Sequence, residues 1–285
     1  MGLGPTKTGA FTAMIPCLPM FFSTWETYHT HTLYLGYFNG PTGTPASLPQ
    51  NEQRTLTIHT EGLILACTVM LISGSYGPAV WQTPLSSLFT LPPLLQSFSA
   101  HTPRDLWVPI ILTSFFSAHL PSCILNVVKA RRSQNLPLLP VFLEWIPMLV
   151  YTASTAAWLS SPYSILLQEN RLVLFCMTQS FVFGRMTTKI ILAHLTRQRF
   201  PYWTVLMAPL VGGAVLTNVP RLGLPRIMSS SVELWYLWAY FVFAVVVYFR
   251  WALLVINSIC EYLGISCLTI PHRRGKGEVP NGKAH

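Results

Sequence analysis

The chain has 285 residues, of which 51% are hydrophobic and only 9% are charged. Soluble globular domains carry about 25% charged residues, so this composition excludes an ordinary water-soluble fold. A formal net charge of +9 would suit a nucleic-acid-binding protein, but the positions of the basic residues favour a different explanation.

Seven apolar segments follow one another along the chain. They comprise residues 11–28, 61–81, 106–128, 138–160, 171–195, 201–219 and 235–263. We expect them to be helical, because backbone polar groups find no water inside a bilayer. Pro16 and Pro19 interrupt the first segment, and Gly74 and Gly77 interrupt the second. Since a span takes about 20 residues, the sequence predicts an all-α polytopic membrane protein with about seven transmembrane helices, in one domain over residues 1–270.

The connections between these segments differ in length. Residues 129–137 and 196–200 are short, and short connections predict antiparallel helices that lie next to each other. Residues 43–60 are longer and polar, contain two prolines and show no helical period. That composition is typical of a loop.

Basic residues are distributed unequally between alternate connections. Ten lie on the side that carries the C-terminus, and five lie on the other side. Cytosolic loops of membrane proteins are enriched in Lys and Arg, so a cytosolic C-terminus is predicted, with residues 271–285 as a basic, disordered tail. Topology and anionic lipid explain the positive charge without nucleic acid. The ten are Arg54, Lys129, Arg131, Arg132, Arg197, Arg199, Arg273, Arg274, Lys276 and Lys283.

The densest group of polar and aromatic side chains starts at Trp25, at the end of the first segment. Glu26 and His29 are three residues apart and share a face if the helix continues, with Tyr28 and His31 beside them. In one interpretation the carboxylate and the rings surround a cationic headgroup. In the other they form an aromatic belt at the membrane surface. A metal site at the two histidines is disfavoured, because positions i and i+2 diverge on a helix.

A second group lies in the fifth segment. Arg185 and Lys189 are one helical turn apart, and His194 follows. Two cations on one face would suit a phosphate or pyrophosphate. Alternatively, Lys189 extends to the membrane surface and Arg185 pairs with Glu144 or Glu261. Arg250 and Glu144 lie in other apolar segments, where charged residues usually pair or face a cavity.

Both groups resemble motifs of the eukaryotic choline/ethanolamine phosphotransferases, within the CDP-alcohol phosphotransferase family. That family carries a W-E-x-Y-H-T-x-T-L-x-L segment that continues through N-G-P-x-E-G, and here the match runs from Trp25 to Thr42. It also carries T-x-K-x-x-x-A-H-x-T, matched by Thr187, Lys189, Ala193, His194 and Thr196. The resemblance covers most of residues 1–42 and 61–270.

The resemblance implies an activity and a location. Phosphocholine or phosphoethanolamine would pass from CDP-choline or CDP-ethanolamine to diacylglycerol, with release of CMP and with Mg²⁺ or Mn²⁺ as cofactor. The enzyme would be an integral protein of the endoplasmic reticulum or Golgi and would form a homodimer. The candidate substrate-binding residues are Trp25, Glu26, Tyr28, His29, Arg185, Lys189 and His194.

The family's catalytic signature, D-G-x-x-A-R…G-x-x-x-D-x-x-x-D, is missing from this sequence. Its aspartates hold the metal on the pyrophosphate, and a nearby group serves as base. Asp105 is the single aspartate of the chain, so no catalytic residue or metal ligand is predicted. In the family the signature precedes the Trp25 motif. We therefore expect the chain to begin past that segment and to be an N-truncated, inactive fragment.

Two other classes of function fit the same features. A small transporter or channel could use Arg185, Lys189 and Arg250 as an anion path. A non-catalytic membrane protein could dimerise with a complete enzyme.

Residues 43–60 interrupt the family pattern, and we hypothesise that they are a retained intron. Their removal joins Thr42 to Glu61 and restores N-G-P-x-E-G. The codons of Gly43-Thr44, Leu56-Thr57 and His59–Glu61 can contain a splice donor, a branch point and an acceptor, respectively. A tolerated surface-loop insertion is the alternative. Transcript sequencing distinguishes the two: we expect messages that lack these 18 codons, and their presence in every spliced message would refute the hypothesis.

Overall fold

The computed structural model describes residues 3–4, 6–31, 61–88, 90, 92–265 and 267. The described residues form helices and contain no strand, which confirms the all-α class. The predicted insertion at 43–60 and the tail at 271–285 lie outside the described residues.

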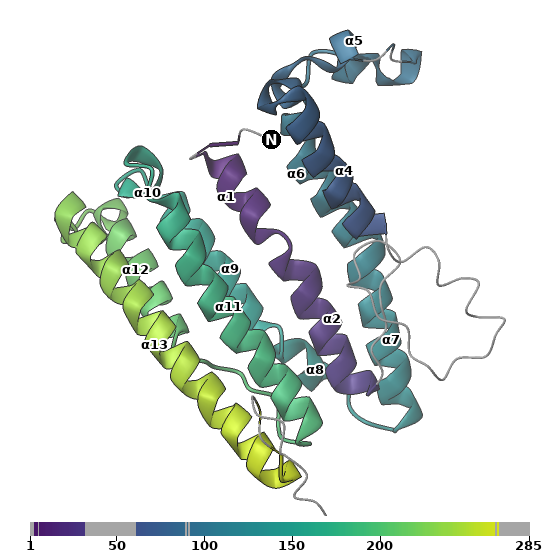
Figure 1. Cartoon of the computed structure of the whole chain (residues 1–285), viewed down its shortest axis with the longest axis vertical. Helices are drawn as coiled ribbons and strands as arrows, with labels where there is room; N and C mark the ends of the chain where they lie inside the picture. Colours follow the sequence, from purple (N-terminus) through teal and green to yellow (C-terminus); the bar gives the residue numbers. More distant parts are fainter. Residues whose placement is uncertain are drawn as a thin grey trace, which may run out of the picture.

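Long helices run alongside one another and form the body of the molecule (Figure 1). Each predicted apolar segment overlaps at least one helix of this body, to which the five-residue α8 also belongs. They are α1 (Lys7–Met14), α2 (Cys17–Thr30), α4 (Glu61–Tyr76), α6 (Pro103–Ser114), α7 (Leu120–Ser133), α8 (Leu139–Leu143), α9 (Ile146–Leu159), α11 (Leu172–Leu195), α12 (Met207–Asn218) and α13 (Ser230–Leu263). Shorter pieces are η2 (Pro78–Gln82), α5 (Leu85–Leu88), η3 (Pro93–Phe98), η4 (Phe115–His119), α10 (Ile165–Gln168) and η5 (Val219–Leu222).

Two helical rods in the described part are long and apolar enough to cross a membrane. One is the continuous α6–η4–α7 rod, Pro103–Ser133, with 31 residues, and the other is α13, with 34 residues. Helix α11 has 24 residues, but Gln179, Arg185 and Lys189 make it more polar. The topology of seven spans therefore stays a prediction.

Prolines determine where several rods break or widen. A proline has no N–H to donate, and its ring clashes with the carbonyl four residues earlier. The first predicted segment breaks at Ile15 and Pro16, between α1 and α2, as Pro16 indicated, whereas Pro19 lies within α2 and does not interrupt it. Pro147 stands in the first turn of α9, and the chain turns just before it. Ahead of Pro121, η4 forms a π-helical turn in which the N–H of Leu120 bonds the carbonyl of Phe115.

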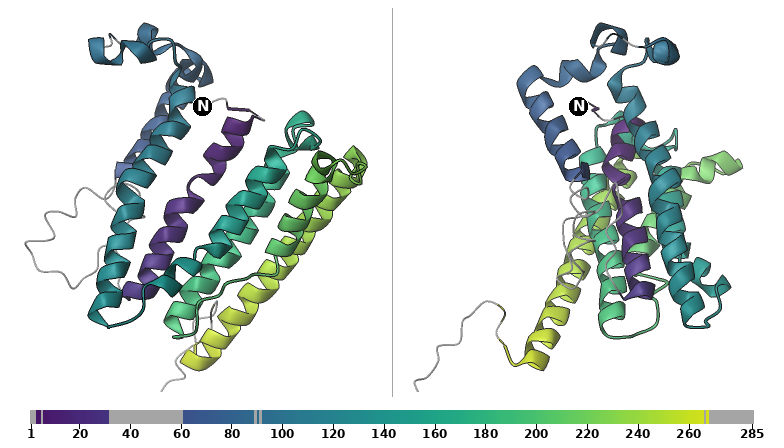
Figure 2. Two further views of the ribbon diagram at one scale, coloured as in Figure 1. Left: turned by 180° about the vertical axis from the view of Figure 1, so that it is seen from behind. Right: turned by 90° about the vertical axis from the view of Figure 1, so that its right-hand side faces the viewer.

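Helix α2 lies between α7 and α11 and packs against both (Figure 2). The other main packed pairs are α9 with α12 and α11 with α13. Helices that follow each other across the two short connections are not among these main pairs. The expectation that they would be direct neighbours is therefore not confirmed, because each of these helices packs mainly against one that is more distant in the chain, such as α2 for α7 and α13 for α11.

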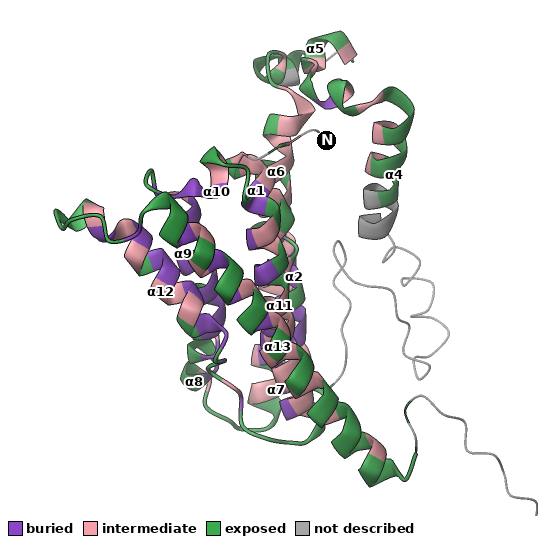
Figure 3. Ribbon diagram, turned by 60° about the vertical axis from the view of Figure 1, so that its left-hand side comes forward, coloured by how far each residue is buried: buried purple, intermediate pink, exposed green. Residues whose placement is uncertain are grey.

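Buried side chains gather between α9, α11 and α12, whereas much of α13 is exposed (Figure 3). The exposed residues of α13 are largely apolar and include Trp235, Val242 and Leu253. A water-soluble protein rarely leaves so continuous an apolar surface uncovered. This surface suits contact with lipid.

A buried carboxylate joins α13 to α9 and α10. Glu233 is fully buried and accepts hydrogen bonds from Trp158 Nε1 at 2.9 Å, Ser164 Oγ at 2.6 Å and the amide of Ile165 at 3.1 Å. A buried carboxylate is tolerated only when such donors compensate its lost hydration. The bond to Trp158 also fixes the orientation of that indole against Gly213 of α12.

The Gly213→Ala substitution should destabilise the protein by about 1–3 kcal/mol, the usual effect of overpacking. A methyl group at this position would overlap ring atoms Cζ3 and Cη2 of Trp158, and the hydrogen bond to Glu233 prevents that ring from moving. Thermal unfolding in detergent measures the change.

Gly184→Ala is the matched control for this prediction. A methyl group there would lie 3.6 Å from Tyr248 Cε2, which is an ordinary contact. Equal melting temperatures for the two variants would contradict the packing described here.

Candidate functional site

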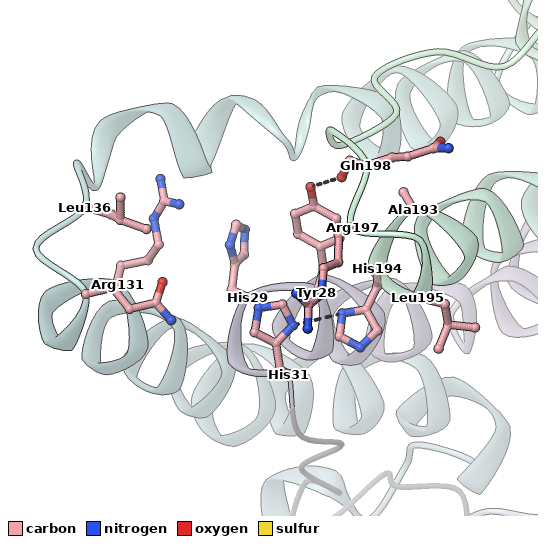
Figure 4. Close-up of a pocket in the computed structure, with 11 residues that line it drawn as sticks. Tyr28, His29, His31, Arg131, Leu136, Ala193, His194, Leu195, Arg197 and Gln198 are labelled. Carbon is pink, nitrogen blue, oxygen red and sulfur yellow. Dashed lines mark hydrogen bonds between the residues drawn. The ribbon is translucent and has the colours of Figure 1, made fainter.

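A pocket of about 590 Å³ lies at the end of the bundle where α2, α7 and α11 all finish (Figure 4). Its lining combines nitrogen-rich polar side chains with the apolar residues Leu136, Ala193 and Leu195. The lining residues are Tyr28, His29, His31, Arg131, Gln134, Leu136, Ala193, His194, Leu195, Arg197 and Gln198.

Helix α2 brings three side chains to the pocket. It ends at Thr30, and His31 caps it in the left-handed conformation, with φ of 54°. Tyr28 and His29 come from its last turn, so all three lie close together. For a residue with a Cβ atom, the left-handed backbone conformation costs about 1 kcal/mol.

His29 is held by a buried carboxylate. Its Nε2 lies 2.6 Å from Glu144 Oε2, and the same oxygen accepts a hydrogen bond from Trp25 Nε1 at 2.9 Å. Glu144 lies in the turn between α8 and α9, so this group ties α2 to that turn. The bond fixes the orientation of the His29 ring at the pocket wall.

The pocket also joins the two sequence motifs. Tyr28 donates a hydrogen bond to the carbonyl of Gln198 at 2.8 Å. The Nδ1 atoms of His31 and His194 are 3.3 Å apart, and their rings stack. Side chains from α2 and from the end of α11 therefore share one site, although His31 and His194 are 163 positions apart in the chain.

The pocket has a positive electrostatic character. Arg131 and Arg197 contribute two permanent charges, and none of the lining residues named above is a carboxylate. Each of the three converging helix C-termini contributes a partial charge of about −0.5, which favours nearby cations. The two arginine charges exceed this contribution, and the nearby carboxylate of Glu144 lies outside the lining and is bonded to His29, so the side chains that face a ligand suit an anion.

The structure brings three of the seven predicted site residues into the pocket, namely Tyr28, His29 and His194. Trp25 is almost fully buried behind His29, so the aromatic-belt interpretation does not fit this residue. Glu26 is also buried, and it accepts a hydrogen bond from Asn126 of α7 at 2.7 Å. Neither residue lines the pocket.

Arg185 and Lys189 bond to backbone carbonyls. Arg185 Nη1 donates to Val247 at 3.1 Å, and its guanidinium lies 5.6 Å from the centre of the Trp251 ring. Lys189 Nζ donates to the carbonyl of Trp203 at 3.0 Å. The interpretation that Arg185 pairs with Glu144 is wrong, because that carboxylate binds Trp25 and His29.

Three basic residues of the pocket were not among the sequence candidates for substrate binding, namely His31, Arg131 and Arg197. The arginines appeared only as evidence for topology. Their position just before or after a helix end is the signal that could have identified them, because helix ends at one side of a bundle surround a common space. His31 was considered beside Glu26 and His29 as part of a possible headgroup site, and as a disfavoured metal ligand with His29.

The pocket does not fit Mg²⁺ or Mn²⁺. These cations prefer oxygen ligands, above all carboxylates, whereas the lining provides imidazoles and guanidinium groups. Elsewhere in the described part, no group of three or more His, Cys, Asp or Glu residues could hold a metal ion. No reaction step is therefore assigned to a metal in this chain.

Comparison with known proteins identifies relatives along most of the chain. It is 27% identical over 267 residues to an uncharacterized CDP-alcohol phosphatidyltransferase class-I family protein of Schizosaccharomyces pombe, which covers 90% of this chain and 59% of the relative. Choline/ethanolaminephosphotransferase 1 of Arabidopsis thaliana is 27% identical over 272 residues, 91% of this chain and 62% of the relative. The Saccharomyces cerevisiae protein of the same name is 26% identical over 269 residues, which is 88% of this chain and 59% of the relative.

Its curated homologues are CDP-alcohol phosphatidyltransferase family members. This confirms the resemblance inferred from the sequence motifs. The chain spans about three fifths of the length of these relatives. No family model matches the chain.

Substitution of Glu144 tests the link between the pocket wall and the fold. Glu144→Ala leaves His29 and Trp25 without their shared acceptor and should destabilise the protein by about 3 kcal/mol, the usual cost of breaking a buried pair. Glu144→Gln keeps one acceptor oxygen and should lose less. Thermal unfolding measures both variants, and an unchanged melting temperature for Glu144→Ala would show that the contact is dispensable.

Proposed function

We propose that the pocket binds the phosphate-bearing part of CDP-choline or CDP-ethanolamine in a phospholipid-synthesising phosphotransferase. The observation that carries this proposal is the meeting of two motifs, both similar to those of choline/ethanolamine phosphotransferases, at one basic pocket. Tyr28 and His29 come from the first motif, and His194 comes from the second. Phosphocholine or phosphoethanolamine would be transferred to diacylglycerol, and CMP would be released.

The residues of the pocket can perform the binding steps of such a reaction. Arg131 and Arg197 would neutralise negative charge on the phosphates, since guanidinium groups pair well with phosphate oxygens. His29 would hold a substrate oxygen through its second ring nitrogen, because Glu144 already fixes the first. Tyr28 keeps the segment after α11 in place through its bond to Gln198.

We further propose a topology of seven membrane spans in the endoplasmic reticulum or Golgi, with the pocket on the cytosolic side. Lys129, Arg131 and Arg132 at the end of α7, and Arg197 and Arg199 after α11, lie at the same end of the bundle as the end of α13 (Figure 1). Such clustering of basic residues is typical of the cytosolic face. The exposed apolar side chains of α13 support lipid contact.

The metal-dependent transfer step requires groups that the given residues do not provide. Mg²⁺ or Mn²⁺ would supply charge neutralisation of the pyrophosphate in a phosphotransferase of this kind. This chain has a single aspartate, Asp105, which caps the first turn of α6 through Thr102. We therefore expect the purified chain to bind substrate without turning it over.

A transporter or channel is less well supported. The cations invoked for an anion path include Arg185 and Lys189, and neither of them lines the pocket. Anion flux in liposomes that contain the purified chain would favour this alternative.

Binding of CDP-choline to the chain in diacylglycerol-containing nanodiscs tests the proposal. Arg131→Gln and Arg197→Gln should each weaken binding about tenfold or more, because a hydrogen bond to a charged group contributes about 1.5–3 kcal/mol. Isothermal titration calorimetry measures the affinity, and radiolabelled CDP-choline tests for the absence of phosphatidylcholine formation.

Arg132→Gln is the matched control, because Arg132 follows Arg131 directly and is exposed but does not line the pocket. Equal losses of affinity in Arg131→Gln and Arg132→Gln would indicate general electrostatic attraction and contradict a specific site. Metal-dependent phosphatidylcholine synthesis by the purified chain would refute the expected inactivity.

A further inference from the structure

The C-terminal end of α13 carries two cysteines that lie outside the packed body. Cys260 is partly exposed in the last turn of the helix, and Cys267 is exposed just after it. Gly264 ends the helix in the left-handed conformation, with φ of 64°, so the chain leaves the helix axis between the two thiols. The two thiols interact with each other. We call Cys260 and Cys267 the terminal thiol pair.

The length of α13 brings this end of the helix to the membrane surface. Its 34 residues measure about 51 Å at 1.5 Å per residue, whereas the hydrocarbon core of a bilayer is about 30 Å thick. Residues 241–247 are entirely apolar, but Asn257, Ser258 and Glu261 in the last two turns are polar and exposed. The terminal thiol pair therefore lies at the boundary between the hydrocarbon and the headgroups.

Cys260 also continues an exposed apolar stripe of α13. Leu253 and Ile256 precede it by seven and four positions, and Leu263 follows it by three. These spacings place all four residues on one face of the helix. The three apolar side chains are 58%, 39% and 56% exposed, and the last turns of α13 are mostly exposed (Figure 3). A chain attached to Cys260 would meet this stripe and the lipid beside it.

The sequence after the pair adds an electrostatic attraction to the same surface. Arg273, Arg274 and Lys276 follow within nine residues of Cys267. Basic residues close to the end of a membrane span are attracted to anionic headgroups. A thiol beside a membrane span is a typical acceptor for a fatty acyl group, and here two such thiols stand together.

We propose that Cys260 and Cys267 are S-acylated with long-chain fatty acids, which hold the end of α13 at the membrane surface. Two acyl chains attach a segment to a bilayer far more stably than one. The inference requires the cytosolic position proposed for this end of the bundle, but it does not require the binding of CDP-choline.

The reaction is a thioester exchange. The Sγ atom of each cysteine attacks the carbonyl carbon of a long-chain acyl-coenzyme A. A bond forms between Sγ and this carbon, and the bond between the carbon and the sulfur of coenzyme A breaks. The proton of the cysteine thiol passes to the released coenzyme A thiol, so no oxidant is consumed. The chain on Cys260 then extends along Ile256 and Leu253 toward the hydrocarbon.

Metabolic labelling of the full chain in eukaryotic cells with an alkyne-bearing fatty acid tests the inference. The wild type should take up label that neutral hydroxylamine releases, because hydroxylamine cleaves thioesters. Cys260→Ser and Cys267→Ser should each lose a large part of this label, and the double variant should lose nearly all of it. Intact mass spectrometry of the purified protein should show one or two long acyl chains.

Cys67→Ser is the matched control, because Cys67 is an exposed thiol within α4, away from the helix ends. This variant should keep the full label. The side chains of the terminal thiol pair are not part of the packed core, so the double variant should melt in detergent at the temperature of the wild type. That result excludes misfolding as the cause of a lost label.

The outcomes separate this inference from the proposed function. Wild-type protein without hydroxylamine-sensitive label, or a label that persists in the double variant, would overturn the acylation and leave the proposed CDP-choline binding intact. A wild-type mass lower by two hydrogens, restored by a thiol reductant, would identify a disulfide between Cys260 and Cys267 and would also overturn it. A C-terminal tag that resists protease in sealed microsomes would overturn both the proposed topology and the acylation.

Discussion

The carboxylate of Glu144 fixes how α2 sits in the bundle. One oxygen accepts hydrogen bonds from both Trp25 and His29, so that side of α2 must face the turn between α8 and α9. Successive residues of a helix are about 100° apart around its axis, and the directions of the other side chains follow. Glu26 points to α7, and Tyr28 points to the segment after α11. The pocket depends on this single rotation.

Two buried carboxylates connect helices in the same way. Glu233 accepts from Trp158 and two further donors, much as Glu144 accepts from Trp25 and His29. In each case an indole N–H helps to satisfy a buried carboxylate between helices that are distant in sequence. Apolar contacts allow helices to slide and rotate at little cost, whereas a buried charge with directional partners permits one arrangement.

Local features of the fold could be predicted from the sequence, because local residues determine them. The apolar segments located the long helices, and Pro16 marked the break between α1 and α2. The pairing of helices could not be predicted, since it depends on contacts between distant segments. The partner of Glu144 is an example: Arg185 was proposed from charge alone, but His29 lies 115 residues away and is nearer in space. The Trp25 motif indicated the region of the pocket, and the arginines that complete it became apparent only from the convergence of three helix ends.

The π-helical turn at Phe115–His119 has a consequence for how this protein tolerates change in length. A π-helical turn accommodates one residue more than an α-helical turn, so α6 and α7 are out of phase with each other by about 100°. Loss of one residue here would convert the rod to a regular helix and rotate α7, with Arg131, away from the pocket. An indel in a surface loop leaves the helices beyond it in register, whereas the same event in η4, in the middle of the rod, alters the site at the end of that rod. The rotation of α7 about its axis, and with it the direction of Arg131, therefore depends on the number of residues in η4.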